Sequence, residues 1–355
     1  MNFWVADPEW GWWIIFYFFL GGIAAGSYFM ATLIELLGSD EDRELPRIGY
    51  WVAFPLIAVC GLLLIADLHV PSRFWHMLVK SEVVDEAVAM GWPGSAKGWS
   101  LIWHAPLVKV WSPMSLGSWA LTGFGLCSFL SFLGSLKSDT KFTQFMRRGW
   151  FGRTLQVVGC FFGLLVAAYT GSLLTATNQP IWSDSVWIAS LFLTSAASSS
   201  IALMLLIAHW RKMGTKESLE RLERADLWAL TLEVLIFTVF FASLGGLLLP
   251  MLNTIHGKVV LATLLLGVLL PLAVHLRIGG ARRWSMPLAA WCALIGGFFF
   301  RYGIIKTPPE ILERGPSIMA SFSPEDERTR GGGRGADPNN RGEEVVPRSK
   351  LNEKH

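Results

Sequence analysis

The sequence is poor in charge and lacks paired cysteines. Lys, Arg, Asp and Glu make up 16% of its 355 residues, against about 25% in soluble domains. Its four cysteines occur singly, without the C-x-x-C spacing of iron–sulfur or zinc ligands: Cys60, Cys127, Cys160 and Cys292. We therefore expect small apolar packing residues at these positions and no iron–sulfur cluster in this chain.

A secretory leader and a convincing haem site are also missing. No Lys or Arg precedes the first apolar run, and no cleavage-like site follows it, so we expect this run to be retained as a helix. His209 and His275, near the ends of two apolar runs, are the only pair that would suit a haem iron. A single histidine at a helix end is more often an interfacial group, so we expect no haem.

Long apolar runs dominate what is present. Eight of them are each long enough to cross a bilayer: residues 12–37, 49–69, 113–135, 153–175, 185–210, 226–250, 257–276 and 286–304. The 18 Trp residues cluster at the edges of these runs, as rings that sit among lipid headgroups do. The sequence predicts an all-α integral membrane protein of about eight helices, divided into two four-helix bundles.

Basic residues are distributed unequally between the two sets of connectors. Fifteen Lys and Arg residues lie in or beside the connectors on one side, against five on the other with the C-terminal tail excluded. The positive-inside rule places the richer side in the cytoplasm, so both termini are expected in the periplasm of a bacterial inner membrane. The net charge of +3 does not by itself indicate a partner, and we expect membrane lipid and no nucleic acid.

Two regions are not expected to cross the membrane. Residues 70–112 form a long, Trp-rich periplasmic connector within a transmembrane domain of residues 1–305. Residues 306–355 are rich in Pro, Gly, Arg and Glu, a composition that cannot bury a core. We expect this second region to be a disordered periplasmic tail or a partner-binding arm.

Polar residues recur near the outer ends of the first four expected helices. Tyr17 lies about five residues into the first helix, and Asp67 and Tyr169 lie roughly 27 Å and 24 Å from the inner ends of theirs. Ser115 and Trp119 open the third helix from outside. Because an aspartate beside hydrocarbon needs a partner or a task, this cluster indicates a polar pocket near one face.

The residue types in this cluster suit quinone chemistry. A quinone site needs an apolar slot, donors for two carbonyl oxygens and a protonatable group for each proton moved. Asp67 and His69 are the candidates for proton transfer, while Tyr17, Ser115, Trp119 and Tyr169 are candidates for quinone binding. Interfacial anchoring alone remains the alternative for each single aromatic residue.

Glycines and scattered polar groups give weaker indications. Gly21 and Gly22 on the first helix either make room for a flat quinone ring or bring another helix close. Glu35, Gln156, Glu233 and Arg301 lie inside other apolar runs. They are candidates for a proton route from the cytoplasm, although helix-to-helix pairs or snorkelling ends explain them equally simply.

Four stretches together resemble a known family. They are Tyr17–Gly26, Asp67–Trp75, Ser112–Trp119 and Tyr169–Leu174, and they are similar in type and order to those of the NrfD/PsrC-type membrane subunits of polysulfide-reductase-like complexes. The resemblance covers essentially all eight helices. The sequence departs from some members by having Tyr17 in place of histidine, and His69 where an acid or glycine is common.

The resemblance implies a subunit without its own redox centre. Such subunits bind menaquinone or ubiquinone near the periplasmic face. They exchange electrons with a periplasmic ferredoxin-like iron–sulfur subunit, which serves a molybdopterin or cytochrome catalytic subunit. Two other functions stay open: an ion or proton transporter without a redox role, and a passive membrane anchor. The substrate of the partner enzyme, the direction of electron flow and the quinone type are not indicated.

Overall fold

The computed structural model describes residues 10–38, 44–104, 112–136, 145, 149–276 and 285–313. Within these residues eight helical segments are long and apolar enough to cross a membrane, and no strand is present. This confirms the predicted all-α, multi-pass membrane fold.

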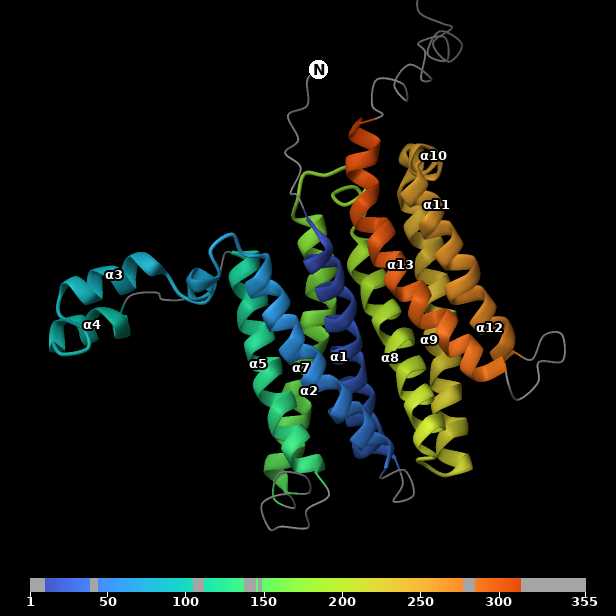
Figure 1. The fold of residues 1–355 in the computed structure, drawn as a ribbon, viewed down its shortest axis with the longest axis horizontal. Helices are drawn as coiled ribbons and strands as arrows, with labels where there is room; N and C mark the ends of the chain where they lie inside the picture. Colours follow the sequence, from blue (N-terminus) through green and yellow to red (C-terminus); the bar gives the residue numbers. More distant parts are fainter. Residues whose placement is uncertain are drawn as a thin grey trace, which may run out of the picture. The chain divides into compact units, whose positions relative to one another are not determined.

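The eight spans are built from helices and a few shorter turns (Figure 1). The spans of the first half are α1 (Trp12–Leu37), α2 (Leu45–Asp67), α5 (Pro113–Ser135) and α7 (Trp150–Thr175). Those of the second half are α8 (Trp187–Arg211), α9 (Lys216–Ser243), a composite span of α11 (Ile255–Ala262), η4 (Thr263–Leu269) and α12 (Leu270–His275), and α13 (Ser285–Glu313). Between α2 and α5 lie η2 (Pro71–Met77), α3 (Ser81–Ala89) and α4 (Ala96–His104), and η3 (Gly245–Leu247) and α10 (Leu248–Asn253) follow α9.

The spans form two groups of four, as the sequence predicted. The first group is α1, α2, α5 and α7, and the second is α8, α9, the α11–α12 span and α13 (Figure 1). Helix α1 packs against α2 and α7 but also against α8 and α13, so it lies at the seam between the groups. We call the end where α1 begins and α13 ends the outer end, and the opposite end the inner end.

Small residues allow the two groups to approach closely. A Cβ atom on Gly26 of α1 would lie 2.7 Å from the carbonyl oxygen of Ala196 on α8, and one on Gly22 would lie 3.1 Å from the Ala196 side chain. In the second group, a Cβ atom on Gly267 would lie 2.7 Å from the Cα atom of Gly296. Such contacts let backbones meet where hydrocarbon gives no hydrophobic drive for association.

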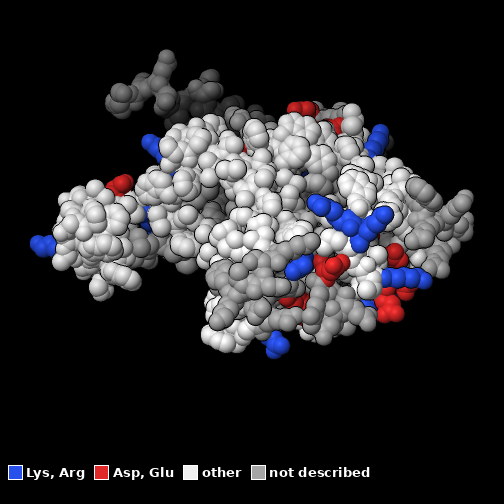
Figure 2. Space-filling model, turned by 60° about the horizontal axis from the view of Figure 1, so that its bottom comes forward, with Lys and Arg blue, Asp and Glu red and all other residues white. Residues whose placement is uncertain are grey.

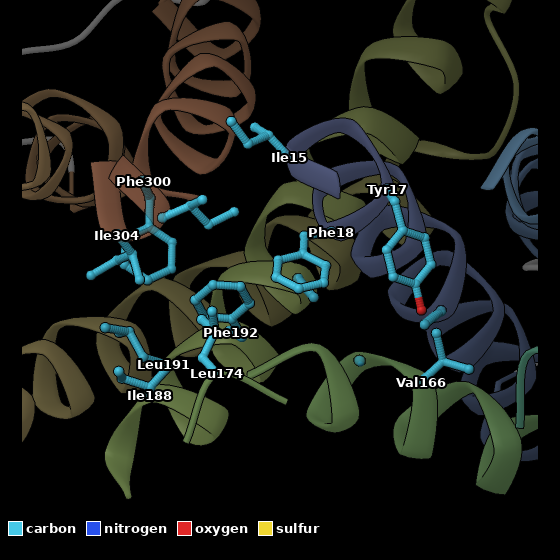
Figure 3. Close-up of a cluster of buried hydrophobic side chains, with 14 of the residues drawn as sticks. Ile15, Tyr17, Phe18, Val166, Leu174, Ile188, Leu191, Phe192, Phe300 and Ile304 are labelled. Atoms are coloured by element: carbon cyan, nitrogen blue, oxygen red, sulfur yellow. The ribbon is translucent and has the colours of Figure 1, made fainter. Parts of the chain in front are cut away.

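Aromatic rings fill the core at the seam between α1, α8 and α13 (Figure 3). Phe18 meets Phe192 edge-on, with centroids 5.9 Å apart, and Phe192 lies 5.3 Å from Phe300 in a similar arrangement. All three side chains are fully buried. Edge-to-face pairs of this kind add to the stability gained from burial alone.

The largest differences from the predicted helix ends are on α9, which ends at Ser243 instead of residue 250 and also begins earlier, and on α13. Helix α9 begins at Lys216 instead of residue 226, because the Thr215 hydroxyl accepts a hydrogen bond from the Ser218 amide and the charged residues that follow favour helix. Helix α13 continues to Glu313, past the expected end at residue 304. Residues 306–313, predicted as the start of a disordered tail, are therefore helical, and the rest of the predicted tail, from residue 314 onward, lies outside the described residues.

The long connector between α2 and α5 contains its own short helices. Helices α3 and α4 pack against each other, and η2 joins them to the end of α2. Trp119 of α5 donates its indole N–H to the carbonyl oxygen of Leu78, at 2.8 Å. This hydrogen bond ties the start of the connector to the first group.

Candidate quinone site and the buried polar networks

Tyr17 lies inside the first group, one turn before Gly21. Its side chain is 3% exposed, and its hydroxyl points toward α7 near Val166 (Figure 3). A Cβ atom on Gly21 would lie 3.7 Å from both the Tyr17 ring and the thiol of Cys60 on α2. Gly21 therefore borders the Tyr17 ring at ordinary van der Waals distance. Within the described residues the Tyr17 hydroxyl makes no hydrogen bond.

Tyr169 of α7 packs directly on the backbone of α5. A Cβ atom on Gly117 would overlap the Tyr169 ring and lie 2.6 Å from its hydroxyl oxygen, so this position requires glycine. Two residues earlier, the Ser115 hydroxyl is buried and has no hydrogen-bond partner among the described residues. Tyr17 and Tyr169 are close enough to interact electrostatically. The structure therefore brings together two of the predicted binding residues, Tyr17 and Tyr169, and places Ser115 on α5 two residues before the glycine that Tyr169 contacts.

Asp67 and His69 lie at the outer edge of the first group. Asp67 is the last residue of α2 and is half-buried, while His69 is exposed and lies near enough to interact with the Asp67 carboxylate. In the part of the sequence that the structure describes, no ion pair joins Asp67 to Arg73. The carboxylate thus remains open to water or to a ligand.

Two other predicted binding residues have structural partners. Trp119 is 40% exposed and uses its indole N–H to hold Leu78. Gly22 faces the Arg301 guanidinium and Ala196, away from the Tyr17 ring. Both contacts hold the fold together, and the packing alternative for Gly22 is the one that the structure favours.

The four residues considered for a proton route lie in different groups. Glu35 of α1 lies beside Tyr50 at the inner end of the first group. Gln156 of α7 is buried there, with no partner for its amide oxygen among the described residues. Glu233 and Arg301 lie in the second group, where they bond to Ser198 and Ser195 of α8.

Arg301 of α13 is the most enclosed charge described. Its guanidinium donates hydrogen bonds to the carbonyl oxygens of Phe18 (3.1 Å), Phe192 (3.4 Å) and Gly297 (2.7 Å) and to the Ser195 hydroxyl (3.3 Å). Its side chain is 1% exposed. A buried charge needs such a full set of partners. The bond to Phe18 connects the second group to α1, next to Tyr17.

Glu233 of α9 continues this network toward the inner end. The Ser198 hydroxyl of α8 donates to its carboxylate at 2.6 Å, and the carboxylate also interacts with Ser195 and with the Arg301 charge. Because Ser195 contacts both charged side chains, it bridges Glu233 and Arg301.

A second buried pair lies two turns further toward the inner end. His275 Nε2 of α12 is 2.7 Å from Asp226 Oδ2 of α9, and both side chains are almost fully buried. They line a cavity of about 60 Å³ together with His209 and Glu223, which gives room for more than one water molecule. His209 is exposed, so the cavity reaches the inner surface. The bond to Asp226 gives His275 a partner other than a haem iron.

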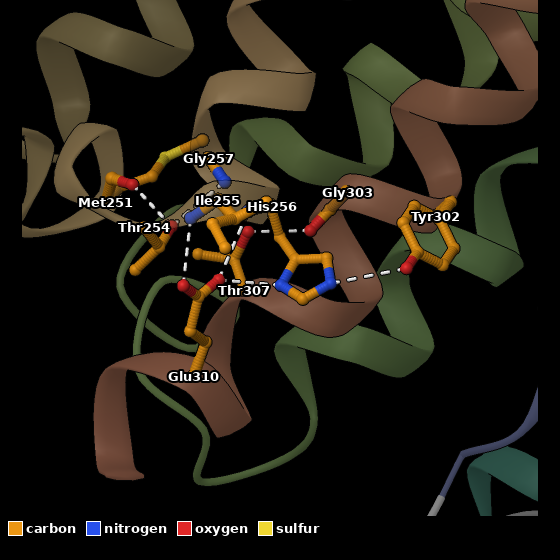
Figure 4. Close-up of polar contacts among 9 residues, drawn as sticks. All are labelled: Met251, Thr254, Ile255, His256, Gly257, Tyr302, Gly303, Thr307 and Glu310. Atoms are coloured by element: carbon orange, nitrogen blue, oxygen red, sulfur yellow. Dashed lines mark hydrogen bonds and ion pairs between the residues drawn. The ribbon is translucent and has the colours of Figure 1, made fainter. Parts of the chain in front are cut away.

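A third polar cluster lies at the outer end of the second group (Figure 4). The Glu310 carboxylate accepts hydrogen bonds from the backbone amides of Ile255 (2.9 Å) and His256 (3.1 Å) at the start of α11. It also lies 2.6 Å from His256 Nδ1, while His256 Nε2 lies 3.3 Å from the Tyr302 hydroxyl. The cluster fastens the last turns of α13 to α11.

Asp226, Ser195 and Ser198 were not among the residues selected from the sequence as site candidates, and His275 was considered there only as a haem ligand. The signal was nevertheless present on α9, whose buried residues recur every three or four positions: Leu222, Asp226, Leu230, Glu233, Phe237 and Phe240. Two carboxylates on an otherwise apolar face indicate that the face carries polar partners.

Metal-ligating side chains do not gather at one place in these residues. In the ranges that the structure describes, no group of three or more His, Cys, Asp or Glu side chains is placed to hold a metal ion. The four cysteines are free thiols on four different spans.

Comparison with known proteins identifies the family. Residues 5–308 match the family described as polysulphide reductase, NrfD. The sequence is 26% identical over 244 residues to the C chain of polysulfide reductase from Wolinella succinogenes, a match that covers 66% of this protein and 70% of that one. It is 32% identical over 71 residues to the C subunit of selenate reductase from Mesobacillus selenatarsenatis, over 20% of this protein and 17% of that one. The protein therefore belongs to the NrfD polysulphide reductase family, whose members are membrane subunits of quinone-linked oxidoreductase complexes.

Proposed function

We propose that this protein exchanges electrons between a partner iron–sulfur subunit and membrane quinone, at a site formed by the outer ends of α1, α5 and α7. The observation that carries the proposal is the approach of Tyr17 to Tyr169, whose hydroxyls make no hydrogen bond within the described residues, near the start of α5, where the Ser115 hydroxyl is buried without a partner. Buried hydroxyls without partners are costly unless a ligand or water satisfies them. Donors beside an apolar wall fit a quinone ring, as menaquinone or ubiquinone would present it.

Each residue has a distinct role in this proposal. A bound quinone takes up or releases two electrons and two protons in each turnover. Tyr17 and Tyr169 donate hydrogen bonds to the ring oxygens, and Gly21 leaves room beside the Tyr17 ring. Asp67 and His69 exchange protons with water at the outer edge.

The partners follow from the names of the relatives, which are the C chain of a polysulfide reductase and the C subunit of a selenate reductase. We infer that this protein too assembles with a catalytic subunit and an iron–sulfur subunit. The finer assignment is a periplasmic ferredoxin-like subunit with a molybdopterin or cytochrome catalytic subunit, in a bacterial inner membrane with both termini outside. Co-purification of the complex, followed by metal analysis, tests the assignment of the partner subunits. Labelling of single introduced cysteines with a membrane-impermeant reagent, added from each side of the membrane, tests the orientation of the termini.

The site is tested by variants that remove one functional group each. Tyr17→Phe and Tyr169→Phe keep the rings but lose the hydroxyls, so the KM for quinol should rise about threefold to tenfold. Asp67→Asn should lower kcat more than it raises KM, because it removes a proton acceptor.

Matched controls lie outside the site. Tyr302→Phe removes a hydroxyl in the second group, and Asp85→Asn removes an exposed carboxylate on α3. Neither should change quinol kinetics. Unchanged kinetics in all three site variants, in fully assembled complex, would contradict the proposed site and favour a passive anchor. Ion flux in liposomes without any redox partner would instead favour a transporter.

We also propose that the second group takes up protons from the inner end. This proposal rests on a series of polar groups that begins at the cavity, continues through Asp226 and His275 to Glu233 with Ser198, and ends at Arg301. Asp226 and Glu233 are two turns apart on the same face of α9, or roughly 10 Å. Arg301 contacts the Phe18 carbonyl beside Tyr17, so a charge change at Glu233 acts on the helix that carries the quinone site.

Glu35 and Gln156 remain candidates for a separate route in the first group. The buried hydroxyls of Tyr28 and Ser131, 2.8 Å apart, lie in the same inner half. The Tyr28 and Ser131 hydroxyls are placed to pass protons between Glu35 and the quinone site. Such a route would run within the first group alone.

Reconstituted complex distinguishes the two routes. In liposomes with an internal pH dye, Glu233→Gln and Asp226→Asn should retain quinol turnover but lose proton uptake from the inner side. Glu35→Gln should lose proton uptake from the inner side only if the protons move through the first group. Glu220→Gln, an exposed carboxylate of α9, is the matched control. Normal uptake in both Glu233→Gln and Asp226→Asn would contradict the route through the second group.

A further inference from the structure

A groove between α2 and α8 at the inner end is not used by the proposed electron or proton transfer. It has a volume of about 260 Å³. Its walls are mostly apolar and include Ile48 and Val52 of α2 and Ile207 of α8. Trp210, which is 69% exposed, and Met213 complete the lining. These apolar walls suit hydrocarbon and give a small hydrophilic anion little to contact.

Two buried donors in and beside this groove lack partners. The indole N–H of Trp51, which lines the groove, is buried with no acceptor among the described residues, and so is the Nε atom of Arg47. The two residues are four apart on α2 and therefore share a face. A buried donor without an acceptor costs about 1–3 kcal/mol, so an acceptor from outside the protein is expected here.

The surroundings are positively charged. The Arg211 guanidinium lines the groove, and exposed Lys212 follows it in the sequence. Glu44, the described carboxylate nearest in sequence to Arg47, accepts a hydrogen bond from the Gly214 amide at 3.1 Å. Figure 2, with the inner end turned forward, shows Lys and Arg side chains at this end, several of them with Asp or Glu side chains close by. The mouth of the groove therefore attracts an anion, while its walls attract an apolar chain.

We propose that this groove binds an anionic phospholipid, with an acyl chain along the apolar wall and the phosphate at Trp51, Arg47 and Arg211. A phospholipid supplies both missing elements at once: acceptor oxygens for the buried donors and hydrocarbon for the groove. A free phosphate ion would leave the apolar wall unfilled. The lipid would lie where α2 and α8, one helix from each group, meet, and would brace the seam between the groups.

Lipid retention by the purified complex tests this site. Native mass spectrometry would compare phosphatidylglycerol with phosphatidylcholine, added to delipidated complex in mild detergent. Trp51→Phe removes the indole donor while keeping an aromatic ring, and Arg211→Gln removes the charge. Each should weaken phosphatidylglycerol binding about fivefold, as expected for one lost cationic or hydrogen-bonding contact at a membrane surface.

Controls of the same kind lie on α9, where Trp228 is 73% exposed and Arg224 is exposed. Trp228→Phe and Arg224→Gln should leave lipid binding unchanged. Equal retention of the two lipids, or equal losses in site and control variants, would overturn the proposal. Displacement of the lipid by inorganic phosphate alone would show that the groove recognises only the anion, which also overturns it. Trp51→Phe decides the question by itself if Arg211→Gln does not assemble.

Discussion

The two groups of helices differ in how many of their buried polar side chains are hydrogen-bonded. In the first group the hydroxyls of Ser27 and Ser115 and the amide oxygen of Gln156 have no hydrogen-bond partner among the described residues. In the second group most are bonded to one another, as in the set of Ser195, Ser198, Glu233 and Arg301 and the pair of Asp226 and His275. Only Ser199 and one oxygen of Asp226 are exceptions among the described residues of that group.

This difference separates two tasks within one family fold. Unpartnered hydroxyls leave hydrogen-bonding capacity for a ligand or for water, which suits quinone binding in the first group. A bonded network fixes charges in place, which suits a scaffold that also responds to protonation. The bond from Arg301 to the Phe18 carbonyl is where the two tasks meet.

The largest effect is expected from Arg301→Met. The substitution leaves three carbonyl oxygens and the Ser195 hydroxyl without their donor and removes the charge near Glu233. Removing one member of a buried charged network typically costs about 3–5 kcal/mol. Thermal unfolding of the complex in detergent should show this loss, whereas Arg224→Met on the exposed face of α9 should not. Wild-type stability would show that the second group does not depend on this network.

The next largest effect is expected from Gly117→Ala. The new methyl group would overlap the Tyr169 ring and so move the ring or the helix, at a cost of about 1–3 kcal/mol. Quinol oxidation should lose affinity with little change in assembly. Gly125→Ala on the same helix is the matched control, because nothing lies within 4 Å of its added atom. Equal kinetics in the two variants would mean that the position of Tyr169 does not matter for quinone.

Sequence alone predicts the fold well because each span carries its own signal. The expected bounds of the first and third helices, residues 12–37 and 113–135, are those of α1 and α5. The start of α9 was missed because the residues from 216 to 225 are charged and amphipathic, so hydropathy does not reveal a helix that extends beyond the apolar span.

The candidate site was only partly accessible to sequence analysis. Counting residues along each helix placed Tyr17, Ser115 and Tyr169 at a similar depth in the membrane. The count does not show which neighbouring helix each side chain faces. Gly22 therefore seemed equivalent to Gly21, although the two face different neighbours. The pairing of Asp226 with His275 joins residues 49 positions apart on two spans, which one sequence cannot show.

A smaller effect is expected from Glu310→Gln, which tests the outer end of the second group. The change removes the charge that holds His256 and weakens the cap on the first amides of α11 (Figure 4). We expect a loss of about 1–2 kcal/mol, seen as faster hydrogen exchange at residues 255–257. Glu313→Gln, three residues later and exposed, should exchange as the wild type does. Quinol kinetics should not change, because this cluster lies outside the first group.

The smallest effect is expected from Trp119→Phe, and it separates two roles for this residue. If the indole N–H only holds the Leu78 carbonyl, its loss costs about 1 kcal/mol locally and speeds hydrogen exchange in η2, with no change in quinol KM. Trp103→Phe on α4, where the ring is 78% exposed, is the control. A raised KM with unchanged exchange would instead return Trp119 to the quinone site. In that case Trp119 would bind ligand. Residues that bind ligand and residues that only hold the fold would then occur together in the first group, within α5 itself.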